Sequence, residues 1–352
     1  MNEIDMRSIL KCVRCGTCRS VCPVFDVLGW ESSGARGRML VAHGISQGLE
    51  VDEAVLDSLN TCTTCGMCKE MCPSGASPTT VVEQTRHQLV LQGKMTEAQK
   101  ELRINALEKG NPLGEPKDRM AWLGDSRKDA ADKAEYVYFA GCLSSYRFPE
   151  VAKRTFDILK NYGVTVLKDE VCCSSPLLRT GSDPSELMSK NLEQIKEVGA
   201  HTIITGCAGC YSTLKKDYPE ELNVVHVSQF LSDRLEELDL RKLDLKVAYH
   251  DPCHLGRCSG VFDAPRELIK AVCELEELEN IREKSKCCGA GGGVLKGYPD
   301  LALEISKKRV EEVPEDVDYL VTVCPLCRTN LQRGSEKVKV IDVLDLLEMS
   351  MG

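Results

Sequence analysis

The sequence predicts a mixed architecture, in which a mainly helical N-terminal domain is followed by two duplicated α/β units. Three observations support this prediction. A compact cysteine motif occurs twice within residues 1–73, a looser pattern of five cysteines occurs twice after residue 141, and strand-like segments alternate with amphipathic helices in step with the second pattern. We place the domains at residues 1–110, 135–240 and 241–352, with a linker at 111–134.

The composition excludes several classes of protein. The chain has 352 residues and carries 45 Lys and Arg against 54 Asp and Glu, a net charge of −9 that does not favour binding to nucleic acid. No apolar stretch approaches the ~20 residues that span a bilayer, and residues 1–10 lack the apolar core of a secretory signal, so we expect a cytoplasmic protein with no transmembrane segment of its own. Thiols stay reduced there, and 20 cysteines therefore indicate metal ligands or redox groups rather than disulfides.

The N-terminal motif has the spacing Cys-x2-Cys-x2-Cys-x3-Cys-Pro and occurs at Cys12–Pro23 and again at Cys62–Pro73. In such a motif three thiolates on one loop bind a cubane 4Fe–4S cluster, and the fourth reaches across to the other cluster. A structural zinc site would instead use two separated pairs of ligands. The spacing therefore predicts two cubane clusters, one bound by Cys12, Cys15, Cys18 and Cys72 and the other by Cys62, Cys65, Cys68 and Cys22.

Helices are expected around these motifs. Apolar residues predict short helices over residues 40–59, and residues 79–108 have a helical pattern that includes His87, which we expect to be a packed or solvated helix residue rather than a ligand. Residues 110–132 combine Pro, Gly and charge without apolar periodicity, which is typical of a linker.

The second cysteine pattern fills the rest of the chain. It consists of a single cysteine, an adjacent pair and a Cys-x-x-Cys pair, and it occurs as Cys142, Cys172, Cys173, Cys207 and Cys210 and again as Cys253, Cys287, Cys288, Cys324 and Cys327. Predicted strands at 136–141, 201–205 and 224–227 repeat at 246–249, 319–323 and 338–341, and a helix follows the first strand of each set, capped in the second by Asp263. Alternating strands and helices indicate largely parallel sheets, whose C-terminal strand ends, where the cysteines lie, gather ligands.

Two alternative roles for these ten cysteines fit the pattern less well. Adjacent cysteines such as Cys172 and Cys173 form a disulfide poorly, because their side chains point in different directions. The Cys-x-x-Cys pairs follow a strand and open a helix, as a thioredoxin-like dithiol does, but that role leaves six cysteines unused. We therefore expect metal clusters in both repeats, although five thiolates are an odd number for a cubane.

The repeat resembles the cysteine-rich CCG domain, and the whole chain resembles the family of iron–sulfur D subunits of heterodisulfide reductases, in which a two-cluster ferredoxin-like segment is fused to two CCG domains. The two N-terminal motifs, the segment His250–Arg257 and the segment Cys287–Gly293 carry the resemblance. It implies two noncubane 4Fe–4S clusters, one bound by Cys142, Cys172, Cys173, Cys207 and Cys210 and the other by Cys253, Cys287, Cys288, Cys324 and Cys327.

The resemblance also implies a function. Members of this family reduce the mixed disulfide of coenzyme M and coenzyme B between the two noncubane clusters, while the cubane clusters relay electrons from a partner, either a membrane cytochrome b subunit or a soluble flavoprotein. The chain would then be an oxidoreductase that is cytoplasmic or attached to a membrane through its partner. His254 matches a position suggested as a proton donor to a leaving thiolate, and its alternative role is a hydrogen bond to the cluster or backbone.

Further residues near the cysteines have less specific roles. Arg179, Arg257, Lys296 and Arg328 are expected to bind an anionic substrate or to offset the charge of the clusters. The glycines Gly289, Gly291, Gly292 and Gly293 indicate close backbone approach to a cluster, or an anion-binding nest. Ser174 replaces a glycine of the family pattern, Cys258 and Cys273 belong to neither cysteine pattern, and the chain looks short for a member of this family.

A second family shares the same layout. The iron–sulfur subunits of glycolate and lactate oxidases also resemble this chain, including its segment Gly34–Arg38. Membership there would make the chain an electron carrier for a flavin partner that oxidises a 2-hydroxy acid. The two complete sets of five cysteines favour disulfide chemistry, since a relay needs no matched pair of clusters. A zinc- or dithiol-based interaction module, the third alternative, would hold no iron.

Overall fold

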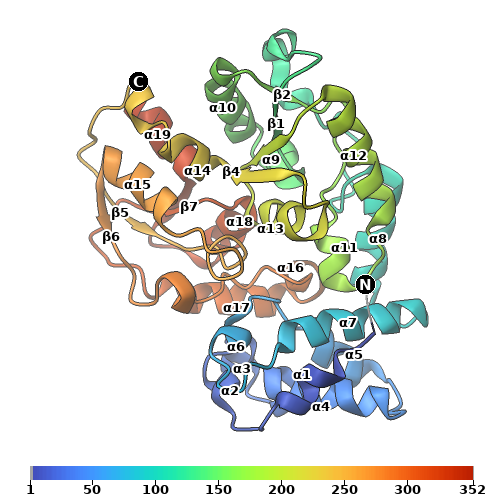
Figure 1. The fold of residues 1–352 in the computed structure, drawn as a ribbon. Helices are drawn as coiled ribbons and strands as arrows, with labels where there is room; N and C mark the ends of the chain where they lie inside the picture. The colour runs from blue at the N-terminus through green and yellow to red at the C-terminus, as the bar shows by residue number, and fades with distance from the viewer. Residues whose placement is uncertain (1–2, 352) are drawn as a thin grey trace.

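The computed structural model describes residues 3–351, which form an N-terminal helical domain and two α/β units (Figure 1). The helices of the first domain are α1 (Met6–Lys11), α2 (Thr17–Ser20), α3 (Pro23–Leu28), α4 (Ala35–Ser46), α5 (Glu53–Asn60), α6 (Met67–Glu70), α7 (Pro78–Leu91) and α8 (Glu97–Lys109), with a short 3-10 turn η1 (Glu31–Ser33). The predicted helical stretch 79–108 is two helices, because Gly93 turns the chain in the left-handed region and Thr96 starts α8 in a capping box with Gln99.

Each α/β unit is built on a four-stranded parallel sheet. The first sheet has the order β2-β1-β3-β4 and the second the matching order β6-β5-β7-β8, so the predicted duplication extends to the topology. The strands are β1 (Tyr136–Phe139), β2 (Val164–Val166), β3 (Thr202–Thr205), β4 (Asn223–His226), β5 (Lys246–Tyr249), β6 (Glu274–Glu276), β7 (Tyr319–Thr322) and β8 (Lys339–Asp342). The sequence did not predict the edge strands β2 and β6, which are three residues long.

Helices cover both sheets, as expected for parallel strands joined by crossovers. In the first unit they are α9 (Cys142–Arg147), α10 (Pro149–Leu159), α11 (Ser175–Thr180), α12 (Ser185–Val198), α13 (Ala208–Asp217) and α14 (Val227–Ser232). In the second they are α15 (Asp263–Val272), α16 (Val294–Gly297), α17 (Pro299–Val310), α18 (Pro325–Gly334) and α19 (Val343–Met351). Asp263, predicted as a cap, is instead the first residue of α15, and Phe262 occupies the N-cap without a side-chain hydrogen bond.

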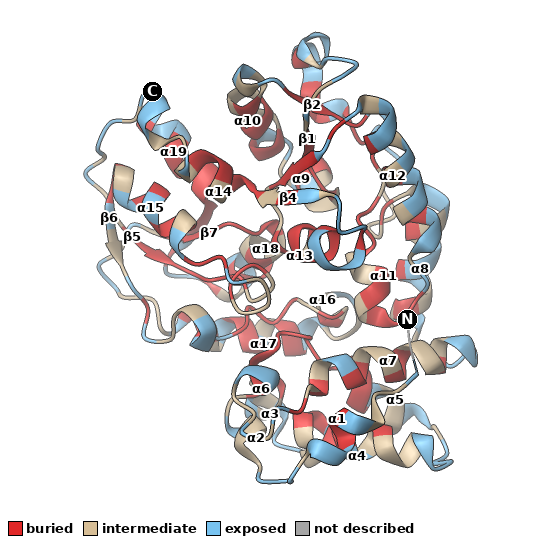
Figure 2. Ribbon diagram, viewed as in Figure 1, coloured by how far each residue is buried: buried red, intermediate tan, exposed pale blue. Residues whose placement is uncertain are grey.

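The two α/β units share one hydrophobic core. Helix α14 of the first unit packs on α15 of the second, and α19 of the second unit packs on α10 of the first. Since α10 and α15 follow the first strand of their units and α14 and α19 follow the last, the two contacts are equivalent and relate the units by an approximate two-fold axis. Buried residues of both sheets belong to one continuous cluster, which Figure 2 shows as the red interior of both units.

The segment expected to be a linker, residues 111–134, contributes to this core. It contains a 3-10 helix, η2 (Ala121–Asp129), and it buries Met120, Trp122 and Leu123 against the first sheet. The Trp122 ring meets Tyr138 and Phe156 edge-on at centroid distances of 5.9 and 6.2 Å. This segment therefore holds a fixed position on the first unit.

A buried arginine joins the three parts of the molecule. Arg86 of α7 donates hydrogen bonds to the carbonyl oxygens of Leu59 and Cys62 in its own domain, of Arg179 in the first unit and of Gly292 in the second. Only 1% of its surface is exposed. Because an uncompensated buried cation is costly, these carbonyls fix the docking of the N-terminal domain on both units. Among residues 3–351, no helix is both long enough and apolar enough to cross a membrane.

Candidate iron–sulfur sites

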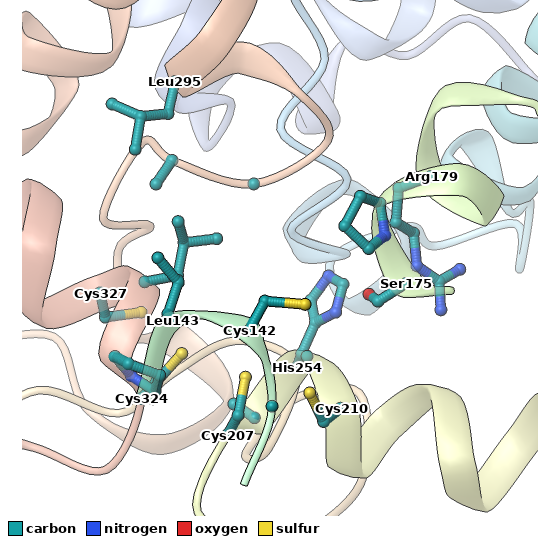
Figure 3. A pocket seen from close by; sticks show the side chains of 18 of the residues that line it. Cys142, Leu143, Ser175, Arg179, Cys207, Cys210, His254, Leu295, Cys324 and Cys327 are labelled. Atoms are coloured by element: carbon teal, nitrogen blue, oxygen red, sulfur yellow. The ribbon is translucent and has the colours of Figure 1, made fainter. Parts of the chain in front are cut away.

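All ten cysteines of the second pattern line one cavity of about 270 Å³ between the two α/β units. Each lies in the segment after a strand or in the first turn of the next helix, so the parallel sheets bring the cysteines to the same edge. Figure 3 shows Cys142, Cys207, Cys210, Cys324 and Cys327 around this space. The rest of the wall is mainly apolar, with Leu143, Pro176, Leu295, Pro325 and Leu326 among its residues.

The thiols of these cysteines form a continuous chain of neighbours. Within the first unit the order is Cys142, Cys172, Cys173, Cys210 and Cys207, and within the second it is Cys253, Cys287, Cys288, Cys327 and Cys324. Cys207 and Cys324 contact each other and join the two halves. All 20 cysteines of the chain are free thiols. Two sets of five converging thiols suit iron–sulfur clusters, which are held by cysteine sulfur.

In the N-terminal domain, the fourth cysteine of each motif lies near cysteines of the other motif. Cys22 of the first motif lines a small void together with Cys62, Cys65 and Cys68 of the second. Conversely, Cys72 of the second motif packs against the same small core as Cys12 of the first. The first of these groups consists of buried residues, whereas Cys12, Cys18 and Cys72 are half-buried and Cys15 is exposed.

One thiol contact connects the N-terminal domain to the cavity. The Cys65 and Cys287 thiols are neighbours, and both residues lie in a small apolar cluster with Met67. The glycine loop of the second unit makes this approach close, since a Cβ atom on Gly291 would lie 2.5 Å from the carbonyl oxygen of Thr63 and one on Gly292 would overlap that of Cys62. These glycines therefore admit the loop that carries the N-terminal cysteines.

His254 lines the cavity, and its Nε2 lies 3.2 Å from the carbonyl oxygen of Thr64. A carbonyl can only accept, so Nε2 carries the proton and donates. Burial lowers the pKa of His254 to about 4, which leaves the ring neutral near pH 7. Both observations favour the hydrogen-bonding role for His254 over proton donation by an imidazolium.

The predicted cations divide into two groups. Arg179 and Lys296 line the cavity, where they pair with Glu83 at 2.8 Å and Glu101 at 2.7 Å. Arg257 instead donates to the carbonyl oxygens of Glu283, Cys65 and Ser285. Arg328 pairs with Asp345 at 3.0 Å and lies over the Phe148 ring. Only the first two are placed to meet a molecule in the cavity.

Ser174 keeps the conformation of the glycine that it replaces. Its φ is 74°, in the left-handed region, and its hydroxyl donates to the carbonyl of Pro184 at 3.3 Å. Gly289, its counterpart in the second unit, has a φ of 89°, and a Cβ there would lie 2.6 Å from the carbonyl oxygen of Ala302. The first unit thus has space for a side chain that the second lacks.

The remaining predicted positions lie outside the cavity. Cys258 would meet a Cβ on Gly66 at 3.2 Å and so lies beside the second N-terminal motif, and Cys273 is buried in the shared core. His87 of α7 bonds the carbonyl oxygen of Gly181 through Nδ1 at 2.9 Å, which agrees with a packed helix residue.

Sequence reasoning missed two residues at the thiols. Arg119, in the expected linker, donates from Nη1 to Cys142 Sγ at 3.2 Å. His250 places a ring nitrogen within 4.8 Å of the sulfurs of Cys288 and Cys327. Burial lowers the pKa of His250 to about 3, so the ring is neutral. The apolar Trp122-Leu123 pair in a charged segment indicates that the segment of Arg119 is packed. The position of His250 at the end of a buried strand indicates that its ring is buried near the cysteines.

Comparison with known proteins identifies the family. Residues 8–76 match the 4Fe–4S dicluster domain, and residues 136–215 and 247–332 match the cysteine-rich domain CCG. The D subunit of dihydromethanophenazine:CoB–CoM heterodisulfide reductase from Methanosarcina mazei is 34% identical over 100% of this chain and 96% of its own length. The chain belongs to the family of heterodisulfide reductase D subunits. As a member of that family it is an iron–sulfur oxidoreductase subunit.

Other similar proteins have different names and are matched over less of their own length. The B subunit of fumarate reductase (CoM/CoB) from Methanothermobacter marburgensis is 40% identical over 60% of the chain and 46% of its own length. EtfAB:quinone oxidoreductase from Syntrophomonas wolfei is 30% identical over 77% of the chain and 43% of its own length. The Methanosarcina mazei alignment spans 394 positions, so insertions within that relative account for the shortness of the chain. A glutamate racemase structure from Bacillus anthracis, 14% identical over 62% of this chain and 80% of its own, has a TM-score of 0.32, too low to inform the fold.

Proposed function

We propose that the chain is the iron–sulfur catalytic subunit of a disulfide reductase complex, with the mixed disulfide of coenzyme M and coenzyme B, or a related disulfide, as its substrate. The observation that supports this most strongly is the single cavity that receives both complete sets of five cysteines. The proposed cofactors are two cubane clusters in the N-terminal domain and two noncubane clusters at the cavity. When bound, a pair of one-electron clusters would supply the two electrons that cleave one S–S bond.

The protein residues of the cavity suit such a substrate. Apolar walls at Leu143, Leu295 and Leu326 suit the chains that flank a disulfide, and Arg179 and Lys296 offer cations to anionic ends. Cleavage consumes two electrons and two protons and yields two thiols. Because His254 is neutral and its Nε2–H is occupied by a carbonyl, we propose that it holds the N-terminal loop against the cavity and that water delivers the protons.

The exposure of the cysteines supports an inward electron route. The site of Cys12, Cys15, Cys18 and Cys72 lies at the surface, the site of Cys22, Cys62, Cys65 and Cys68 lies inside, and Cys65 contacts Cys287 at the cavity. A donor that docks on the N-terminal domain would therefore deliver electrons through the first site to the second and then to the cavity. We propose an electron-donating redox protein, a membrane cytochrome b or a soluble flavoprotein, as that partner.

The function is tested on anaerobically purified protein. Four clusters predict about 16 irons per chain. Supplied with a reduced viologen dye, the protein is expected to convert the mixed disulfide of coenzyme M and coenzyme B into two thiols, and Cys142→Ala is expected to abolish this reaction. An iron content near eight, or no thiol formation by the fully loaded protein, would overturn the proposal. Reduction of a dye by glycolate or lactate, in the presence of a flavoprotein partner, would instead support the electron-carrier alternative.

A further inference from the structure

Arg119 occupies the far end of the chain of thiols that begins at Cys65. Its Nη1 donates to Cys142 Sγ at 3.2 Å, and its Nε and Nη2 donate to Glu170 Oε1 at 3.0 and 2.6 Å. The side chains of Arg119 and Glu170 are 8% and 0% exposed. The guanidinium is therefore fixed in direct contact with a cysteine of the first unit.

Glu170 holds this arginine in one orientation. Its Oε2 and Oε1 accept hydrogen bonds from the backbone N–H groups of Ala140 and Gly141, each at 2.9 Å. A carboxylate held by two backbone donors cannot follow the arginine, so the guanidinium has to lie between Glu170 and Cys142. The ion pair is neutral as a whole, but its positive end faces the sulfur.

The second unit offers its thiols a different environment. Arg309 Nε donates to His250 Nδ1 at 3.1 Å, and a ring nitrogen of His250 lies within 4.8 Å of the sulfurs of Cys288 and Cys327. Arg257, the cation near Cys253, gives its N–H groups to backbone carbonyl oxygens. Within residues 3–351, Arg119 is the one cationic side chain that hydrogen-bonds a cysteine sulfur.

This difference has a redox consequence. Hydrogen bonds to the sulfur ligands and nearby positive charge stabilise the reduced, more negative state of an iron–sulfur cluster and raise its reduction potential. The first unit receives such a bond from a buried cation at Cys142, whereas the second receives one at Cys287 from the uncharged backbone N–H of Gly289, at 3.3 Å. The two units therefore have the same set of cysteines and differ in the groups that donate hydrogen bonds to the sulfurs.

We propose that Arg119 makes the site of the first unit the terminal electron acceptor, by raising its reduction potential above that of the site in the second unit. This inference rests on one part of the proposed function, the presence of an iron–sulfur cluster in each unit, and does not depend on the substrate. One electron passes from the second unit, which is oxidised, to the first, which is reduced. A second electron from the donor, arriving through the contact of Cys65 with Cys287, then reduces the second unit again, so that both sites hold an electron.

The test is a redox titration of the anaerobically purified full chain, monitored by EPR and Mössbauer spectroscopy. Arg119→Gln is expected to lower the midpoint potential of one noncubane site and to leave the other three sites unchanged. Arg119→Lys, which keeps the charge but not the fixed N–H···S bond, is expected to lower it less. Arg127→Gln is the matched control, since Arg127 lies in the same segment with its side chain 60% exposed and paired with Asp118.

A second variant addresses the buried carboxylate that Arg119→Gln leaves without its partner. The double variant Arg119→Gln, Glu170→Gln removes both charges and is expected to show the same fall in potential. Unchanged potentials in either charge-removing variant with about 16 irons per chain would overturn the proposal. Loss of one site's iron in both variants would also overturn it, because Arg119 would then hold the site together. Failure of wild-type protein to reduce a disulfide would refute the proposed function and leave this measurement valid.

Discussion

The two α/β units have the same strand order and the same five cysteines, yet their outer surfaces meet different neighbours. In the second unit, Cys287 contacts Cys65 of the N-terminal domain, and glycines at 291 and 292 make room for that contact. In the first unit, Cys142 contacts Arg119, which the segment between the domains supplies. The two units therefore share their pattern of cysteines and differ in the residues packed outside it, and this difference is the basis of the separate electron-transfer roles proposed above.

The largest expected effect comes from removing equivalent cysteines, Cys287→Ala in the second unit and Cys172→Ala in the first. Each variant is expected to lose about four irons. In Cys172→Ala the remaining site still touches Cys65 and should be reduced rapidly, whereas in Cys287→Ala the remaining site has lost that contact and should be reduced more slowly. Iron analysis and stopped-flow reduction by a low-potential donor measure both effects.

The control for these variants is Cys273→Ala, which removes a buried cysteine that belongs to neither pattern and should retain all iron. Equal reduction rates in Cys287→Ala and Cys172→Ala would show that the contact of Cys65 with Cys287 is not the route into the cavity.

A smaller effect is expected from the last strand of each unit, which ends in His226 in the first and Asp342 in the second. Each accepts a hydrogen bond from the backbone N–H two residues further on. Burial raises the pKa of Asp342 from 3.8 to about 7, so its contribution to stability is present below about pH 4 and is lost, by at most about 4 kcal/mol, as the pH rises through 7. Burial lowers the pKa of His226 from 6.5 to about 4, so its contribution is present above pH 6.5 and is lost as the pH falls.

The two positions should therefore respond to pH in opposite directions. Asp342→Asn is expected to raise the free energy of unfolding at pH 8 more than at pH 6, and His226→Asn to reduce the loss of stability below pH 6.5. Denaturant unfolding of both variants and of wild-type protein over this range measures the effect. If the free energies of unfolding of Asp342→Asn and wild type differed by the same amount at every pH, the raised pKa of Asp342 would be contradicted.

The smallest effect is expected from exchanging the residues that follow the adjacent cysteines. Gly289→Ser places a Cβ against the carbonyl of Ala302 and should destabilise the protein by about 2 to 3 kcal/mol. Ser174→Gly removes the strain of a positive φ together with one hydrogen bond, and these terms nearly cancel, so the change should be below about 1 kcal/mol. Thermal unfolding measures the stability of both variants. Equal losses of stability in both would contradict the expected difference between positions 174 and 289.

The sequence predicted what depends on local pattern. The strands β1, β3, β4, β5, β7 and β8 and the helices after β1 and β5 follow from apolar periodicity. The exchange of Cys22 and Cys72 between two clusters stays a prediction from spacing, and the structure places Cys22 beside Cys62, Cys65 and Cys68. The edge strand β6 was missed because Glu274-Leu-Glu276 is short and polar. The contact of Cys65 with Cys287 depends on how the domains dock, and Arg119 lies in a stretch whose Pro, Gly and charge are typical of a solvated linker, so neither could be read from local pattern.

The approximate two-fold axis between the units has a consequence for how a molecule enters the cavity. A perfectly two-fold cavity would accept an unsymmetrical disulfide in either direction, and each half would then be released at random from either unit. Here the two units match in their cysteines but not in the residues beside them. Leu143 and the Ala208-Gly209 pair of the first unit occupy the positions of His254 and the Pro325-Leu326 pair in the second, and all of them line the cavity. The small residues Ala208 and Gly209 on one side and the larger His254, Pro325 and Leu326 on the other make the cavity asymmetric. An unsymmetrical disulfide would therefore bind in one preferred direction.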